Sequence, residues 1–160
     1  SRVKMKKSQA IVTDLIVAVG LGIMLVIAIT LSWEYYSLKL NDDATYSDMF
    51  IRASQISETL VSTPGYPKNW NSTNVIIAGL TDSDRNISEV KLNSFNLLSN
   101  QTIKDMFKIN LYNFTFEVKY LNNTKISLIG ESGNATTSVN SRRLIIYRNE
   151  TAILNFVIWN

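Results

Sequence analysis

The sequence predicts an α+β protein in which a long N-terminal hydrophobic and amphipathic α-helix is followed by a globular, antiparallel β-rich head. Three observations support this fold class. Residues 15–33 are 19 consecutive uncharged residues, and no Pro or Gly interrupts residues 34–62. Beyond Pro64 the chain changes to short apolar runs and strict alternation, which are typical of strands. The 160 residues allow one ordinary domain with an appended segment, not two full domains.

The chain begins with a basic leader, residues 1–8, which contains Arg2, Lys4, Lys6 and Lys7. The rest of the chain is near neutral, with 12 basic and 13 acidic side chains, so no nucleic-acid partner is expected. Basic residues that precede an apolar span stay on the cytoplasmic side. We therefore expect the N-terminus to be cytoplasmic and the head to lie outside the cell.

The apolar run of residues 15–33 comes next, within a long helix predicted over residues 9–62. As a helix the run is about 28 Å long, which is close to the hydrocarbon thickness of a bilayer. It is apolar on all sides, so it needs either lipid or the centre of a helical assembly. A core helix of a soluble domain is disfavoured because the rest of the chain is too small to surround it. A cleaved secretory signal is disfavoured because the run is long and no small-residue cleavage site follows it. The expected assembly residues are Asp14, Leu15, Ile16, Val19, Ile23, Leu25, Val26 and Ile29.

The second half of this helix, residues 34–62, is predicted to be amphipathic. Met49, Phe50, Ala53, Ile56 and Leu60 recur at the spacing of one helix face, so this half should pack on the head. Residues 41–43 are a possible kink or cap, and residues 62–65, with Pro and Gly, predict the end of the helix.

The head, residues 63–160, is expected to contain five or six strands. Residues 111–121 alternate most clearly, with aromatic residues and Val118 on one side and polar residues on the other. The expected elements are short strands at 75–78 and 89–92, broken helix over 93–107, strands at 111–121 and 126–129, and a hairpin of 144–147 with 153–159.

Seven Asn-x-Ser/Thr sequons lie in the head, where composition alone predicts about three. This motif marks N-glycosylation sites on the surface of exported proteins, so covalent N-glycans are expected. An Asn-, Ser- and Thr-rich composition is the alternative explanation. The sequon asparagines are Asn71, Asn86, Asn100, Asn113, Asn122, Asn134 and Asn149.

The residues of the chain offer no catalytic constellation, and no enzyme activity, metal or other cofactor is expected. Without Cys or His, thiol and imidazole chemistry and zinc sites of the usual kinds are excluded. Asp82, Asp84 and Asn86 match the opening of a calcium loop. Ile87 and Asn93 then stand where such a loop needs Gly and Glu, so a solvated loop is favoured.

Asp14 is the one costly residue of the apolar segment, because a carboxylate at the edge of such a helix is usually functional or paired. The alternative is a position in the interface near the helix N-terminus, where negative charge is favourable.

These features together resemble the archaeal type IV pilins. Lys6-Lys7-Ser8-Gln9, then residues 10–14 and an apolar helix, is similar to their class III prepilin signal. The resemblance implies cleavage by a prepilin peptidase between Ser8 and Gln9, with Ser8 departing from the more usual Gly or Ala. Asp14 resembles the acidic residue that these pilins carry early in the mature helix. Residues 65–70 followed by 75–80 and 91–92, and residues 143–147 with 153–159, look like a head seen in archaeal pilin-like proteins.

The resemblance implies a structural subunit of an extracellular type IV pilus-like filament used for surface attachment. Its partners would be further copies in a helical homopolymer, the membrane before assembly, the pilus assembly machinery and the peptidase. A membrane-anchored monomeric surface protein or receptor is the alternative. A subunit of an archaellum-type motility filament is the third possibility, and an anchored enzyme a distant fourth.

Overall fold

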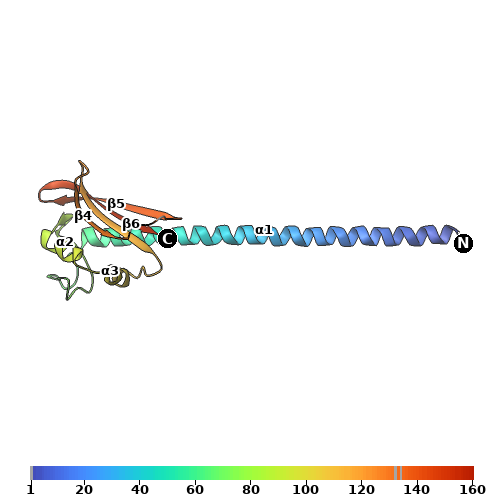
Figure 1. Ribbon diagram of the computed structural model, residues 1–160, viewed down its shortest axis with the longest axis horizontal. Coiled ribbons are helices and arrows are strands. Elements are labelled where there is room, and N and C mark those ends of the chain that lie inside the picture. Colours follow the sequence, from blue (N-terminus) through green and yellow to red (C-terminus); the bar gives the residue numbers. More distant parts are fainter. Residues whose placement is uncertain (1, 132, 134) are drawn as a thin grey trace. The chain divides into compact units, whose positions relative to one another are not determined.

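The computed structural model describes residues 2–131, 133 and 135–160, with side chains from Val12 onward. The chain divides into two compact units, Ser1–Ala44 and Thr45–Asn160. Helix α1 spans Arg2–Ser62 and contributes residues to both units (Figure 1). The second unit holds a six-stranded sheet and two short helices, so the predicted α+β class with a β-rich head is confirmed.

Helix α1 ends where the sequence predicts. Its last residue is Ser62, and Pro64 and Gly65 follow directly. Gly65 has a φ of +80°, a backbone conformation that side-chain-bearing residues rarely adopt, so the helix cannot continue through it. Residues 41–43 do not interrupt the helix.

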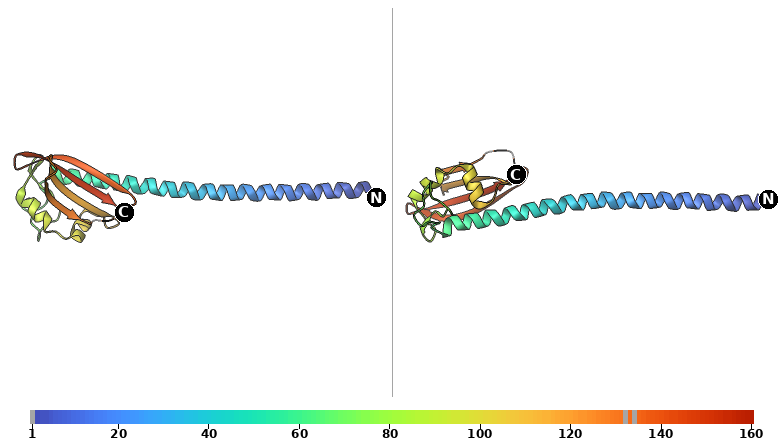
Figure 2. Two further views of the ribbon diagram at one scale, coloured as in Figure 1. Left: turned by 45° about the horizontal axis from the view of Figure 1, so that its top comes forward. Right: turned by 90° about the horizontal axis from the view of Figure 1, so that it is seen from below.

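The sheet has the strand order β1-β2-β5-β6-β3-β4. Figure 2 shows its long strands, coloured orange to red, side by side. All neighbouring strands are antiparallel except β2 and β5, which are parallel, so the sheet is mixed rather than purely antiparallel. Residues Arg148 and Asn149, both at positive φ, form the tight turn between β5 and β6. The strands are β1 (Thr81–Ser83), β2 (Asn86–Ile87), β3 (Asn113–Tyr120), β4 (Lys125–Gly130), β5 (Ser138–Tyr147) and β6 (Glu150–Trp159).

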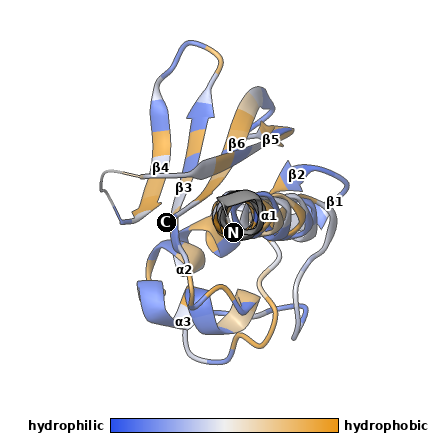
Figure 3. Cartoon of the chain, turned by 90° about the vertical axis from the view of Figure 1, so that its right-hand side faces the viewer, coloured by the Kyte–Doolittle hydropathy of each residue, from blue (hydrophilic) through white to orange (hydrophobic). Residues whose placement is uncertain are grey.

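One face of the sheet forms the core together with residues 45–62 of α1. Phe114 and Phe116 are fully buried on this face, as the alternation along residues 111–121 predicts, and Phe156 of β6 is fully buried with them. Figure 3 shows hydrophobic and hydrophilic bands following one another along β3 and β4. The face of α1 that packs here carries four residues of the predicted set, Met49, Ala53, Ile56 and Leu60, each at most 5% exposed. The fifth, Phe50, was wrongly assigned to this face, because it is 56% exposed and follows Met49 directly, about 100° further round the helix. A buried hydrogen bond of 2.7 Å between the Ser57 and Ser141 hydroxyls joins α1 to β5.

Two short helices follow one another before β3. Helix α2 is Glu89–Asn96 and helix α3 is Asn100–Phe107, so the broken helix predicted over 93–107 is confirmed. The Ser99 hydroxyl caps α3 by accepting a hydrogen bond from the Thr102 N–H. The strand predicted at 89–92 is wrong, because Leu92 and Phe95, three residues apart, bury one face of a helix.

The strand predicted at 75–78 is also wrong. This segment makes only a single bridge, between Tyr66 and Ile77. The N–H groups of Ile76 and Ile77 both donate to the Tyr66 carbonyl, and both side chains are exposed. The apolar run therefore belongs to a surface loop, and only Ala78 at its end is buried.

Candidate assembly surface

The exposed apolar surface of α1 is the largest unexplained feature of the structure. From Val12 to Leu40, the large hydrophobic side chains are between 51% and 75% exposed. The predicted assembly residues Leu15, Ile16, Val19, Ile23, Leu25, Val26 and Ile29 all belong to this surface. Among the residues searched, from Val12 onward, one helix is long and apolar enough to cross a membrane, and its apolar window is not buried by this chain. The protein therefore presents an apolar helix that needs an outside environment to cover it.

Polar groups on this surface are few, and two hydroxyls bond within the helix itself. The Thr30 hydroxyl donates to the carbonyl groups of Val26 and Ile27, at 3.0 and 2.9 Å. The Ser32 hydroxyl donates to the Ala28 carbonyl at 2.7 Å. Such bonding lets Ser and Thr occupy helices in apolar surroundings.

Small residues leave room for close approach to this surface. Ala18 and Gly22 are four residues apart, so they lie on one side of the helix. A Cβ added at Gly20 or Gly22 would meet nothing within 4 Å in this chain. Small residues at this spacing let two helix backbones pack closely in apolar surroundings. The predicted assembly residues are all bulky or charged, and this spacing of small residues was missed.

Asp14 lies at the N-terminal end of the apolar surface, and its side chain is exposed. Among the side chains described, none forms an ion pair with it. Ser8 and Gln9, the predicted processing site, lie in the first turns of α1, where only the backbone is described.

The sequon asparagines lie on several elements of the second unit. Asn71, Asn86, Asn122 and Asn149 are exposed, while Asn100 and Asn113 are half-buried. The side-chain oxygens of Asn71 and Asn122 each accept a hydrogen bond from the backbone N–H two residues on, which is a turn geometry. Asn113 instead accepts a 3.0 Å hydrogen bond from Lys104. Asn134 lies outside the described residues.

The acidic loop that resembles a calcium site holds an ion pair instead. Lys91 is only 5% exposed, and its ammonium group donates to the Thr81 carbonyl at 2.8 Å and to the Asp82 carboxylate at 2.9 Å. This hydrogen bond from Lys91 holds the pKa of Asp82 below its usual range. Among the described residues no group of acidic side chains is arranged to hold a metal ion.

A second charged cluster joins α1 to the loop before β3. The Asp48 carboxylate accepts hydrogen bonds from Arg52 at 2.7 Å and from the Tyr112 hydroxyl at 2.8 Å. The Arg52 guanidinium, followed by the Tyr112 hydroxyl, lowers the pKa of Asp48. Arg52 also donates to the Lys108 carbonyl at 2.9 Å, so the cluster stabilises the packing of α3 and β3 against α1.

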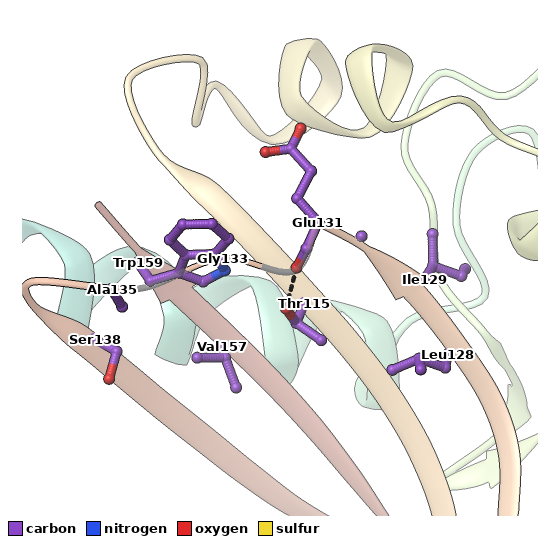
Figure 4. A pocket seen from close by; sticks show the side chains of 10 residues that line it. Thr115, Leu128, Ile129, Glu131, Gly133, Ala135, Ser138, Val157 and Trp159 are labelled. Atoms are coloured by element: carbon purple, nitrogen blue, oxygen red, sulfur yellow. Dashed lines mark hydrogen bonds between the residues drawn. The ribbon is translucent and has the colours of Figure 1, made fainter.

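The face of the sheet that points away from the core carries a hollow of about 520 Å³ (Figure 4). Trp159 forms one wall, with Gly133 close against its indole ring. Thr115, Val157 and Leu128 line the floor, and the Thr115 hydroxyl donates to the Glu131 carbonyl at 3.0 Å. The sequence analysis did not find this hollow, because its lining comes from four strands and a loop that only the sheet order brings together.

Comparisons with protein-family models, with curated proteins and with solved structures find no match to this chain.

Proposed function

We propose that this protein is a structural subunit of an extracellular filament of the type IV pilus kind, which assembles through its N-terminal helix. The observation that carries the proposal is the apolar surface of α1, exposed from Val12 to Leu40 and continuous in one helix with residues that form the core of a folded head. In a filament, copies of this helix cover one another, while the heads remain at the surface. Before assembly, lipid covers the same residues.

Hydrophobic burial does not favour the filament over the membrane, because lipid tails are as apolar as Leu. Close packing between helices therefore has to stabilise the assembled state relative to the membrane-inserted one. The small residues Ala18, Gly20 and Gly22 support this, since they allow close backbone approach and extensive dispersion contact. Asp14 adds specificity, because a carboxylate buried among helices needs a positively charged partner. The leader lysines Lys6 and Lys7, or the N-terminal amine of a processed neighbouring copy, supply that charge.

The expected orientation in the membrane places processing on the cytoplasmic side and glycosylation on the exterior side. A prepilin peptidase acts between Ser8 and Gln9 on the cytoplasmic side, where the basic leader stays. The pilus assembly machinery then transfers the subunit from the membrane to the filament. The head carries N-glycans and faces the exterior, where the filament serves adhesion.

Electron microscopy of material sheared from the cell surface tests the proposal. Fibres that contain this chain, identified by mass spectrometry, are the expected result. Intact cells on which the protein stays monomeric in the membrane would instead establish the anchored receptor. Fibres that rotate and drive swimming would establish the motility filament.

Variants of Asp14 separate assembly from insertion. Asp14→Ala should leave the amount of protein in the membrane fraction unchanged or raised, yet lower the filament yield, because the buried pair is lost. Asp14→Glu is the matched control, since it keeps the charge and should assemble better than the Ala variant. Equal filament yields from wild type and Asp14→Ala would show that the carboxylate is only an interfacial helix-start residue.

A further inference from the structure

The second unit has an outward sheet face that the proposed function leaves unused. It is formed by three cross-strand rows of β5, β6, β3 and β4, which the register defines. These rows, called here the outer sheet face, are Leu144–Ile153–Lys119–Lys125, Arg142–Asn155–Glu117–Leu128 and Asn140–Val157–Thr115–Gly130.

The outer sheet face is both apolar and basic. Leu128 and Leu144 are 57% and 58% exposed, and Ile153 and Val157 between them are half-buried. The same rows carry Arg142, Lys119 and Lys125 against the single carboxylate of Glu117. A partner for this face therefore has aliphatic side chains and excess negative charge.

Asn155, in the middle row, is the buried polar residue of this face. It is 6% exposed, and its side-chain nitrogen donates to the Glu117 carboxylate at 3.1 Å. Its side-chain oxygen is buried and accepts no hydrogen bond from the described part of the chain. A buried acceptor without a donor costs about 1 to 3 kcal/mol.

The hollow beside Trp159 lies on the outer sheet face, because Leu128 and Val157 belong both to the rows and to its lining. It offers a concave site for a side chain of the partner. The described sequon asparagines lie outside the three rows, and Asn113 pairs with Trp159 in the row next to them. Asn122 and Asn149 lie in turns at the strand ends, Asn113 begins β3, and Asn86 borders the face on β2 beside Ile146. No sequon asparagine lies within the three rows.

We propose that the outer sheet face docks residues 34–43 of α1 from a second copy of this chain. This segment begins where the apolar run ends, and its Tyr35, Tyr36, Leu38 and Leu40 are 63% to 68% exposed. It carries Glu34, Asp42 and Asp43 against Lys39, so it has the opposite excess charge to the outer sheet face. The sheet then lies between two helices, with residues 45–62 of its own α1 on the inner face.

The spacing of the segment fits a helix lying on a sheet. Glu34, Leu38 and Asp42 are four residues apart and share one helix face, with Tyr35 beside them. Leu38 fills the hollow next to Leu128, and Asp42 pairs with Arg142. The inference rests on the proposed filament, since it assigns a contact between neighbouring subunits.

Disulfide trapping in the full-length chain tests the contact, and the chain has no native Cys. Cells that co-express the single variants Leu38→Cys and Leu128→Cys are treated with a mild oxidant. We expect a product of about twice the 18.1 kDa chain mass, with the Leu38→Cys peptide joined to the Leu128→Cys peptide in mass spectrometry. The matched control replaces Leu128→Cys by Val90→Cys, which is 72% exposed on α2 and lies outside the face. A mixed disulfide with Val90→Cys as abundant as that with Leu128→Cys, or none with Leu128→Cys, overturns the inference.

Charge reversal provides the second measurement. Arg142→Glu should lower the yield of the mixed disulfide by about fivefold or more, because like charges then face each other. Adding Asp42→Arg should restore it, whereas Asp42→Arg in an otherwise unchanged pair should lower it. Filaments that form without the disulfide refute the docking and leave the proposed function intact. A membrane protein that forms neither filaments nor disulfides refutes both.

Discussion

Phe156→Ala tests the side on which each residue of β6 lies, and this assignment underlies both the core and the outer sheet face. Phe156 is fully buried, stacks on Phe114 with ring centroids 5.7 Å apart, and meets Phe107 edge-on at 6.4 Å. Truncating a buried Phe costs about 3 to 5 kcal/mol, because it removes transfer free energy and leaves a cavity. This is a large share of the 5 to 15 kcal/mol that stabilises a typical domain.

The assay is urea unfolding of the full-length chain in detergent micelles, followed by tryptophan fluorescence. Trp70 reports on the head, because it is 2% exposed and donates to the Gly79 carbonyl at 2.9 Å. At an m-value of about 2 kcal/mol/M, Phe156→Ala lowers the midpoint by about 1.5 to 2.5 M. Phe156→Leu, which retains more of the volume, loses less and serves if the Ala variant does not fold.

Val157→Ala is the matched control, because its side chain is half-buried on the opposite face of the same strand. We expect it to cost about 1 kcal/mol or less. Equal losses from the two variants, or a loss below about 1 kcal/mol for Phe156→Ala, would show that β6 does not alternate as described. The outer sheet face would then have to be redrawn as well.

Two further substitutions and one glycan measurement have outcomes that the structure predicts. The hydrogen bond from Arg52 lowers the pKa of Asp48, so the pair stabilises the fold above the ordinary Asp pKa of about 4. This stabilisation is lost as the pH falls further. In Asp48→Asn the urea midpoint should therefore fall less between about pH 4 and pH 2 than it does in the wild type. This contribution is below about 1 kcal/mol because the pair is partly exposed. Gly65→Ala should lower the urea midpoint, because the added Cβ would lie 2.6 Å from the Ile77 carbonyl oxygen and because Gly65 has a φ of +80°. An unchanged midpoint would contradict the described turn. Site-resolved glycan mass spectrometry should find Asn122 occupied more fully than Asn113, because Asn122 lies in an exposed turn while Asn113 is half-buried against Lys104; the reverse order would contradict this explanation.

Elements with a long hydrophobic pattern, or with Pro and Gly at their ends, could be predicted from the sequence. The end of α1 follows from Pro64 and Gly65, and β3 follows from the alternation of aromatic and polar residues. Residues 75–78 could not be placed, because a short apolar run looks the same in a buried strand and in an exposed loop. The parallel pairing of β2 with β5 was not predicted either, since a two-residue strand has no measurable period.

Of the two candidate surfaces, the apolar surface of α1 could be predicted from the sequence and the outer sheet face could not. The apolar surface of α1 is local in sequence, so composition alone identifies residues such as Leu15 and Ile29. The outer sheet face depends on register, because Arg142, Asn155 and Leu128 come from three strands that only the sheet order aligns. A sequence pattern tells which residues point to one side of a strand, and it does not tell which strand lies next to it.

Because the Thr30 and Ser32 hydroxyls donate to carbonyl groups of α1 itself, they need no hydrogen-bond partner from the surroundings of the helix. A helix whose hydroxyls bond to its own carbonyls can exchange lipid for protein contacts without breaking a hydrogen bond. The exchange then carries little enthalpic penalty in either direction, and its equilibrium depends on packing and on the single charge of Asp14. In the proposed filament, a helix of this kind could pass from the bilayer into the assembly and back without local unfolding.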